Sequence, residues 1–591
     1  MSTTNTRIFC LYLIKPSHYD DDGYVISWKL SPIPSNSLAS VYGLTMDIVE
    51  RNVLGQDWTF EVEAIDETNT EVRVGDVAKQ VQAADAGLVM LIGVQSNQFP
   101  RALDIARPLR ERGIQVAIGG FHVSGVISML GGEDADFKAA QQMGISLFAG
   151  EAEGRLQEVL ADATQGALKP LYNHMNDLPG IEETPVPFMP AGHVARTAYN
   201  LTSFDAGRGC PYQCSFCTII NVQGRKSRRR SPDDIEKIIR LNLAQGVKRF
   251  FITDDNFARN KDWEPIMDRL IAMREGEKLD FNFFIQVDTL CHKIPNFIEK
   301  CARAGVKRVF IGLENVNPAN LKDAKKRQNK ITEYRQMLLA WKQWHVITYA
   351  GYILGFPTDT PERILHDIDV VKEELPVDIL EFFFLTPLPG SEDHQKLFRA
   401  GVAMDADLNK YDLNHYTTGH ALMSRADFED IYARAWERYY SIDHVERIMR
   451  RAAISGISTS NVLLLAVWFM GALKIEGVHP LEVGWIRRKP RLNRRHGMSI
   501  EPAWLFYPKY YAELAWKLSR WAALYLRFGL AQRRVEKDPN KMSYMDRAMT
   551  PVSDDDEEEL EMFKTADAVA YLDQERRLEK ARHGEFSPAG E

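Results

Sequence analysis

The sequence lacks a hydrophobic run long enough to cross a membrane and has only six cysteines in 591 residues. The longest apolar run, Val462 to Leu473, is shorter than the about 20 residues that span a hydrocarbon core, so it predicts a buried helix. Six cysteines are too few for a disulfide scaffold in so long a chain. The first residues show neither a basic leader nor a cleavage site, so we expect a cytoplasmic protein.

The sequence also lacks a strong charge of either sign. It has 73 Lys and Arg against 81 Asp and Glu, a formal net charge of −8. This balance disfavours nucleic acid as a partner. The hydrophobic fraction of 45% is ordinary for a soluble protein, and the length predicts two or three domains.

Two successive alternations of β-rich runs and helical segments predict an α/β protein. We expect a Rossmann-like open parallel sheet in residues 1–178 and a proline-rich linker at 179–196. Residues 197–424 are expected to form a partial (βα)6 TIM-type barrel. A helical domain is expected at 425–550, followed by an acidic and polar tail at 551–591 that we expect to be disordered.

Three of the six cysteines lie within eight residues, directly after a predicted strand. Cys210, Cys214 and Cys217 form a CxxxCxxC loop. Three thiolates can hold three irons of a 4Fe-4S cluster and leave the fourth iron open to the amine and carboxylate of a small molecule. A structural zinc site needs a fourth ligand, and the neighbourhood offers neither a fourth cysteine nor a well-spaced histidine. The spacing therefore favours an iron-sulfur cluster.

The triad and its flanks resemble the radical S-adenosylmethionine (SAM) superfamily over roughly residues 197–424. The resemblance implies that a cluster on the three cysteines reductively cleaves SAM to a 5′-deoxyadenosyl radical. It also implies cofactor-binding residues beside the triad and at the ends of later strands, where barrel sites lie. These are Phe216, Asp254, Asp255, Asn256, Glu314, Gly351, Gly355 and Pro387. Each alone also fits a capped turn, a loop acid or a packing glycine.

A Rossmann-like domain ahead of such a barrel resembles the cobalamin-binding radical SAM class. The glycine-histidine turn at Ile118–Gly125 carries this resemblance, and polar residues flank the edge where open α/β sheets receive ligands. The candidate cofactor-binding residues are Ser17, Asn36, Asn97, Gly119, Gly120 and His122. The first strand is not followed by an Asp-x-His-x-x-Gly loop, so the expected cobalamin is base-off without a histidine ligand. The absence of Gly-x-Gly-x-x-Gly argues against a dinucleotide.

Two further segments have competing interpretations. The basic run 225–230 suggests RNA, but a solvated or anion-holding loop is favoured. Aromatic residues at near-helical spacing between Trp504 and Phe528 could meet lipid, but a domain-packing stripe is favoured because aromatic rows usually serve cores. Peripheral membrane contact therefore stays an alternative.

The resemblance implies a radical SAM enzyme, and we expect cobalamin-dependent methylation of an unactivated carbon. The expected substrate is a small or lipid-like molecule, and the expected electron donor is a ferredoxin or flavodoxin. Three alternatives stay open: cobalamin-dependent radical cyclisation or rearrangement, RNA modification of the methylthiotransferase type, and a non-enzymatic iron-sulfur or cobalamin sensor. The methylthiotransferase class needs an auxiliary cluster that Cys10 alone cannot hold.

Overall fold

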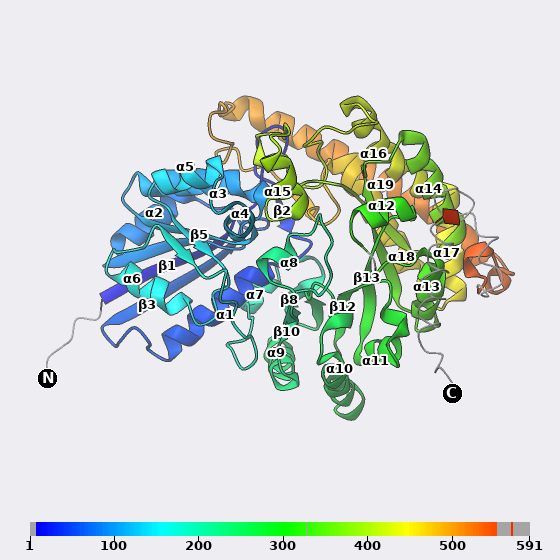
Figure 1. Ribbon diagram of the computed structural model, residues 1–591, viewed down its shortest axis with the longest axis horizontal. Helices are drawn as coiled ribbons and strands as arrows, with labels where there is room; N and C mark the ends of the chain where they lie inside the picture. Colours follow the sequence, from blue (N-terminus) through cyan, green and yellow to red (C-terminus); the bar gives the residue numbers. More distant parts are fainter. Residues whose placement is uncertain (1–6, 327, 552–568, 571–591) are drawn as a thin grey trace, which may run out of the picture.

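The computed structural model describes residues 7–326, 328–551, 569 and 570 (Figure 1). Helices and strands alternate along most of the chain, which confirms the α/β class. The tail predicted at 551–591 lies outside the described residues except at 551, 569 and 570.

The N-terminal residues form the predicted parallel sheet, which has six strands. Strand β1 (Arg7–Lys15) is buried over most of its length, because helices cover both faces of a parallel sheet. The sheet order is β3 (Trp58–Asp66), β1, β4 (Ala86–Leu91), β5 (Gln115–Gly119), β6 (Ser146–Ala149) and β7 (Leu171–Asn173). The connecting helices are α1 (Asn36–Glu50), α2 (Val74–Ala83), α3 (Phe99–Arg110), α4 (Phe121–Leu130), α5 (Ala135–Gln142) and α6 (Leu156–Thr164).

A second parallel sheet of six strands follows, and its strands pair in chain order. They are β8 (Leu201–Phe204), β11 (Arg249–Ile252), β12 (Asn282–Val287), β13 (Val306–Glu314), β14 (Ile347–Leu354) and β15 (Ile379–Phe384). The helices between them are α9 (Pro232–Ala244), α10 (Trp263–Ile271), α11 (Phe297–Ala304), α12 (Pro318–Asp323), α13 (Tyr334–Gln343) and α14 (Pro361–Glu374). Ser231 caps α9 in a reciprocal capping box with Asp234. All six carboxyl ends therefore lie at one edge of this sheet.

The C-terminal region is helical but also contributes a strand. Its helices are α16 (Arg425–Tyr439), α17 (Ile442–Ile454), α18 (Thr459–Gly471) and α19 (Ala503–Lys537). Between α18 and α19, β16 (Trp485–Arg488) pairs antiparallel with β2 (Ser27–Leu30) from the N-terminal region. The sequence analysis missed this strand, because four residues are too short for a period-two pattern to stand out.

The apolar helix α18 is longer than its sequence suggests. A π-helical turn, Ala472–Glu476, continues it, and the stretch Thr459–Glu476 is long and apolar enough to cross a membrane. The prediction that this segment is too short was therefore wrong. Half of the stretch is buried inside the protein, and Val462 and Phe469 belong to the main core. Burial of this kind is typical of a core helix.

Two glycines bring the N-terminal sheet and the second sheet into backbone contact. A Cβ atom on Gly125 of α4 would lie 2.7 Å from the carbonyl oxygen of Pro389 and 2.9 Å from Cα of Gly390. Gly390, in the turn after β15, has a φ of +103°, a value that side chains disfavour. Asn221 Nδ2 donates to the carbonyl oxygen of Gly390 over 2.9 Å, and this bond fixes the same junction.

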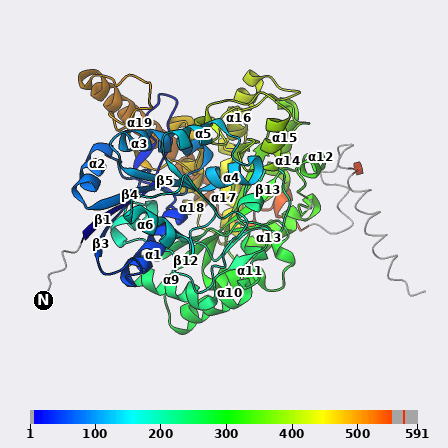
Figure 2. The ribbon, with the colours of Figure 1, turned by 60° about the vertical axis from the view of Figure 1, so that its left-hand side comes forward.

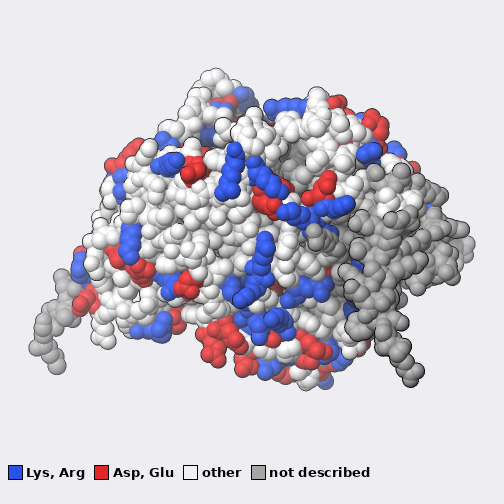
Figure 3. All heavy atoms as spheres, viewed as in Figure 1, with Lys and Arg blue, Asp and Glu red and all other residues white. Residues whose placement is uncertain are grey.

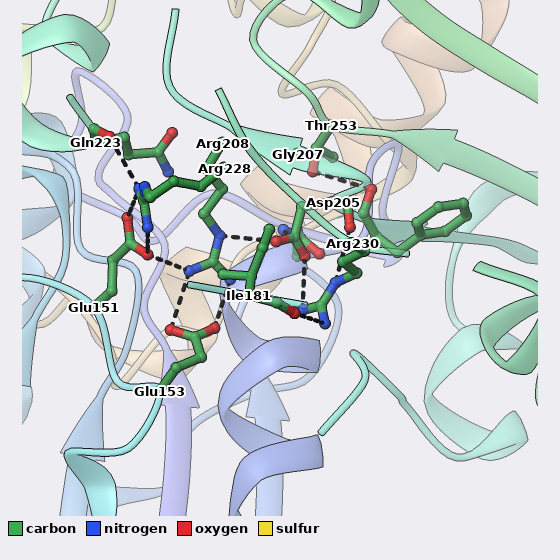
Figure 4. A network of polar contacts seen from close by, with 12 residues as sticks. Glu151, Glu153, Ile181, Asp205, Gly207, Arg208, Gln223, Arg228, Arg230 and Thr253 are labelled. Atoms are coloured by element: carbon green, nitrogen blue, oxygen red, sulfur yellow. Dashed lines mark hydrogen bonds and ion pairs between the residues drawn. The ribbon is translucent and has the colours of Figure 1, made fainter. Parts of the chain in front are cut away.

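A buried ion-pair network also joins the two sheets (Figure 4). Arg208 Nη1 lies 2.7 Å from Glu151 Oε2, its Nη2 lies 2.7 Å from Glu153 Oε1, and its Nε lies 2.8 Å from Asp205 Oδ2. The two glutamates follow β6, whereas Asp205 and Arg208 follow β8. Arg228 also binds Glu151, with its Nη1 2.6 Å from Oε2. We name these five residues the Arg208 network.

The Arg208 network revises the interpretation of the basic run 225–230. Arg230 is fully buried and lies 3.6 Å from Asp205, while Arg228 is 15% exposed. These two arginines hold carboxylates of the protein itself. The prediction of an anion-holding loop therefore applies to Arg228 and Arg230, and the prediction of a solvated loop is wrong for these two residues.

Removing the central cation should destabilise the protein strongly. Arg208→Met leaves two glutamates and Asp205 buried without their main partner, and breaking a buried pair in this way costs about 3 to 5 kcal/mol. The control Arg240→Met removes a pair with Glu236 on the exposed side of α9 and should change stability little. Urea unfolding at pH 7 measures both, and equal free energies of unfolding for the two variants would contradict the role of the network.

The free energies of unfolding of the wild type and of Arg208→Met should also depend differently on pH. Burial opposes ionisation of Asp205, but Arg208 and Arg230 outweigh it and lower its pKa below 3.8; Arg208 likewise lowers the pKa of Glu153 below 4.5 against the effect of burial. The stabilisation that these two ionised carboxylates give the folded protein is complete above their pKa values in the unfolded chain. It is lost as the pH falls through their lower pKa values in the folded protein. The stability gap between the wild type and Arg208→Met should therefore narrow below about pH 4.

Candidate active site

The cysteine loop leaves the carboxyl end of β8 and is closed by a short hairpin. Strand β9 (Gly207–Arg208) pairs with β10 (Arg228–Arg229), and the triad lies between them. Burial raises the pKa of Cys210 to about 11 and that of Cys217 to about 12, and in both cases the Cys214 thiol adds to the effect. Free thiols are therefore the stable form of Cys210 and Cys217 unless a metal takes the place of their protons.

Two predicted cofactor residues brace this loop. Asp254 Oδ1 accepts from the backbone N–H groups of Ala206 and Gly207, both over 2.7 Å. Asp255 Oδ2 accepts from Gly209 N–H over 3.1 Å, directly before Cys210. Burial raises the pKa of each carboxyl to about 7. The structure thus uses both acids to position the backbone that presents the triad.

Asn256, the third predicted residue of this strand end, keeps one polar atom free. Its Nδ2 donates to Asp288 Oδ2 over 2.9 Å, while its buried Oδ1 has no hydrogen-bond partner. Asp288 also accepts from the Tyr212 hydroxyl over 3.0 Å and forms an ion pair with Arg259. Asn256 therefore offers an acceptor beside the loop, since Tyr212 lies between Cys210 and Cys214.

Glu314 pairs with a lysine that the sequence analysis missed. The carboxylate ends β13 with a φ of 65° and forms an ion pair with Lys326. Burial favours the neutral amine, but Glu314, Cys214 and Cys217 outweigh it and raise the pKa of Lys326. Its Nζ lies 5.9 Å from the ring centroid of the predicted residue Phe216. Lys326 is therefore a cation held against the triad.

Gln328 is a second residue that the sequence analysis missed. Its Nε2 lies 3.5 Å from the Cys214 sulfur, and Asn329 Nδ2 donates to the carbonyl oxygen of Leu313 over 2.7 Å. The polar run after α12 therefore folds back across the cysteine loop. The only sequence signal for Gln328 is the polar run in which it lies. That run does not indicate the contact with the triad, because Gln328 and Cys214 are 114 residues apart in the chain.

The structure gives the predicted residues of the later strands packing roles. A Cβ atom on Gly351 would lie 2.8 Å from the Phe310 ring. Gly355 has a φ of +96°, and a Cβ atom there would overlap the Phe428 ring of α16. Pro387 is buried in the turn after β15. The glycines admit phenylalanine rings, and their predicted contact with a cofactor stays a prediction.

The N-terminal sheet ends in two adjoining cavities. The smaller, which we name the sheet cavity, has a volume of about 150 Å³ and is lined by residues that include Ser40, Gly119, Gly120, Glu151 and Arg208. The larger, the central cavity, has a volume of about 510 Å³. The two share the lining residues Asn36, Ser37, Gly93 and Phe121. One elongated ligand could therefore occupy both.

The central cavity brings several predicted residues to the cysteine loop. Ser17, Asn36 and Asn97 line it together with Thr218 and Ile219, which directly follow Cys217. Two buried atoms at the cavities, Asn36 Oδ1 and Ser40 Oγ, have no hydrogen-bond partner among the described residues. Orphaned buried acceptors and hydroxyls of this kind point to a ligand.

His122 differs from the other predicted residues of its turn. It is fully buried, its Nδ1 lies 3.2 Å from Ser96 Oγ, and its ring centroid lies 4.3 Å from that of Phe99. Burial lowers its pKa to about 4. The geometry is that of a packed neutral histidine, so its contact with a cofactor stays a prediction.

A histidine-carboxylate pair in the central cavity had no sequence signal. His18 Nε2 lies 3.0 Å from Glu482 Oε2; burial lowers the pKa of this imidazole, but Glu482 outweighs that effect and raises it. His479, which also lines the cavity, has its pKa lowered to about 4 by burial. The cavity therefore holds two imidazoles whose pKa values are shifted in opposite directions. The partners are more than four hundred residues apart in sequence, so no local pattern predicts them.

The donor set fits a cluster better than a single ion. Among the described residues, no group of three or more His, Cys, Asp or Glu side chains could hold one metal ion. The thiols of a cubane each bind a different iron and need not converge on a point. Three neighbouring thiols without a fourth ligand therefore suit a cluster with one open iron.

Comparison with known proteins agrees with this chemistry. Residues 206–371 match the model of the radical SAM superfamily. Bacteriochlorophyllide d C-12(1)-methyltransferase of Chlorobaculum tepidum is 28% identical over 46% of this chain and 59% of its own. Hopanoid C-2 methylase of Rhodopseudomonas palustris is 23% identical over 60% of this chain and 64% of its own. The chain thus spans about three fifths of each of these relatives.

Solved structures agree on the fold. The radical SAM methyltransferase TsrM of Kitasatospora setae, solved with cobalamin and a [4Fe-4S] cluster bound, superposes with a TM-score of 0.56 at 14% identity. The match covers 77% of this chain and 97% of TsrM. The match at residues 206–371, which contain the whole triad, shows that the chain has a radical SAM domain, and the relatives show its homology to radical SAM methyltransferases.

Proposed function

We propose that the protein is a radical SAM enzyme that methylates an unactivated carbon of a small or lipid-like molecule with the help of cobalamin. The central cavity carries this proposal, because it joins the ligand-receiving edge of the N-terminal sheet to Thr218 and Ile219 after the triad. Two relatives are named for methyl transfer to a bacteriochlorophyllide and to a hopanoid, which supports methylation as the outcome.

The proposed division of labour follows from the two ends of the site. When bound, the 4Fe-4S cluster supplies the electron that cleaves SAM, and cobalamin supplies a carrier for the methyl group. Cys210, Cys214 and Cys217 would hold the cluster, while Asp255 and Lys326 keep the loop and its charge in place. Asn256 Oδ1 is an acceptor for a polar group of SAM because it lacks a partner.

The two adjoining cavities fit a ligand with a bulky part and a tail. Gly120 has a φ of +146°, and a Cβ atom there would collide with the backbone of Gly93 and Val94, so only glycine allows this close approach. Ser40 Oγ and Asn36 Oδ1 are unpartnered in the cavities. We place the cobalamin tail in the sheet cavity and its ring in the central cavity. His18, whose pKa is raised by Glu482 against the effect of burial, adds a polar side chain to the lining of the central cavity.

The finer parts of the proposal concern layout and partners. We take the second sheet as a partial (βα)6 TIM-type barrel and keep the divisions 1–178, 179–196, 197–424 and 425–550. A ferredoxin or flavodoxin would supply electrons in a cytoplasmic setting. The base-off state of cobalamin without a histidine ligand remains part of the proposal.

Loss of the triad should abolish cluster assembly without unfolding the protein. Replacing Cys210, Cys214 and Cys217 together by alanine removes every thiol of the loop, so iron bound after anaerobic reconstitution should fall to background and SAM cleavage should cease. The control is Cys10→Ala, which alters a buried cysteine in β1 and should leave bound iron unchanged. Retention of iron by the triple variant would refute the proposed ligands.

Filling the sheet cavity should block cobalamin and spare the cluster. Ser40→Leu puts three more carbon atoms into a cavity of about 150 Å³, so affinity for cobalamin should fall about tenfold or more, equivalent to about 1.4 kcal/mol. Ser40→Ala is the matched control: it adds no volume and loses only the hydroxyl, so its affinity should fall much less than that of Ser40→Leu. Equilibrium titration followed by the cobalamin absorbance measures both, with bound iron as the internal check. Normal binding by Ser40→Leu would place cobalamin elsewhere.

A further inference from the structure

Helix α19 exposes a row of large apolar side chains. Figures 1 and 2 show that part of this helix runs along the edge of the molecule. The most exposed are Trp504 at 77%, Leu526 at 65% and Tyr511 at 61%. We name the row the outer face of α19, and it comprises Trp504, Tyr507, Tyr511, Trp516, Leu518, Tyr525, Leu526 and Leu530. The favoured reading of these aromatics as a packing stripe is wrong for the exposed ones.

The helix is two-sided. At 100° per residue, Trp504, Tyr511 and Leu518 lie on one side, together with the alanines at 515 and 522. The opposite side packs inward through the buried residues Phe506, Phe528 and Val535. Among the described residues, one face of this 35-residue helix is therefore packed and the other, apolar face is exposed.

Most of the exposed charged side chains of α19 are basic. Between Trp504 and Arg534 they are Lys509, Arg520, Arg527, Arg533 and Arg534. Lys509 pairs with Glu501 and Arg534 with Glu446, and one exposed acid, Glu536, lies near the end of the helix. The acid in this stretch, Glu513, is half-buried and paired with Lys489 and Lys517. Elsewhere, on the face drawn in Figure 3, basic and acidic side chains are mixed. The basic side chains of α19 complement an anionic surface.

The apolar surface continues from α19 to the central cavity. Trp468 has its ring centroid 6.4 Å from that of Trp521 in α19 and 5.7 Å from that of Trp485 in β16. Trp485 is 47% exposed, and Leu481, which is 39% exposed, lines the central cavity. The half-buried rings of Trp521 and Trp468 therefore connect α19 to the exposed Trp485 of β16, and Leu481, four residues before Trp485, reaches the cavity.

We propose that the outer face of α19 docks the protein on an anionic lipid surface. The apolar row enters the boundary between headgroups and acyl chains, and the flanking arginines and lysines meet the headgroups, as in helices that lie in a membrane interface. Trp504, Tyr511 and Trp516 suit this depth because their rings are apolar with a polar edge. The route along β16 would bring a lipid-like substrate to the central cavity, and this second step alone rests on the proposed function.

Vesicle flotation of the full-length protein tests the docking. Wild type should float with vesicles of phosphatidylcholine containing about 30 mol% phosphatidylglycerol and far less with pure phosphatidylcholine, because the basic rows need anionic headgroups. The affinity of the double variant Tyr511→Ser/Leu526→Ser for the anionic vesicles should be lower than that of the wild type by a factor of about ten or more. Leu422→Ser, on an equally exposed leucine (56%) remote in sequence from α19, is the matched control and should bind as wild type.

Three measurements decide between a lipid and other partners. Arg520→Glu/Arg527→Glu should weaken anionic binding, and Trp504→Phe/Trp516→Phe should bind yet lose the blue shift of tryptophan fluorescence on vesicle addition. The variants change exposed residues, so melting curves should match wild type. Absence of flotation, or binding by the Tyr511→Ser/Leu526→Ser variant equal to wild type, would overturn the proposal. So would light scattering that shows these changes converting a dimer to a monomer. Neither cofactor nor turnover is needed, so failed methylation leaves this outcome unaffected.

Discussion

The buried guanidinium of Arg208 is the constraint on which the site depends. It lies among Glu151, Glu153 and Asp205 at distances of 2.7 to 2.8 Å, two residues before Cys210. A cation taken out of water is tolerated only if every donor finds an anion, so the loop after β6 and the loop after β8 must fit together. The position of the cysteine loop is therefore set in part by the N-terminal sheet, and the cofactor-binding regions form one unit.

Local patterns in the sequence were sufficient to predict the strands and the triad. Apolar runs marked the buried strands, Ser231 and its acidic neighbours marked the start of α9, and the spacing of Cys210, Cys214 and Cys217 pointed to a cluster. These signals are local because hydrogen bonding, capping and ligand spacing act over a few residues. Strand β16 carried no such signal, since its pairing partner β2 lies far away in the chain.

The electrostatic parts of the site were beyond prediction from sequence. Arg228 and Glu151 are 77 residues apart, and Arg228 sat in a run that also fitted an exposed loop. Lys326 and Gln328 reach the triad only because α12 turns the chain back over it. Periodicity likewise predicted an amphipathic α19 but not which of its aromatics face inward, since that depends on what packs beside the helix. Asp254 and Asp255 were found from their place at a strand end, yet their hydrogen bonds show that they brace backbone.

The contact between Gly125 and Gly390 has a consequence for how such a protein can change over evolutionary time. The two backbones touch where any side chain would separate them, so neither position can drift alone, even though each lies far from the other in the chain. A recombination event that exchanges the N-terminal sheet for that of a distant relative would succeed only if the incoming helix also had glycine at this crossing. The contact between these two glycines therefore restricts the exchange of the N-terminal region, although the chain looks modular.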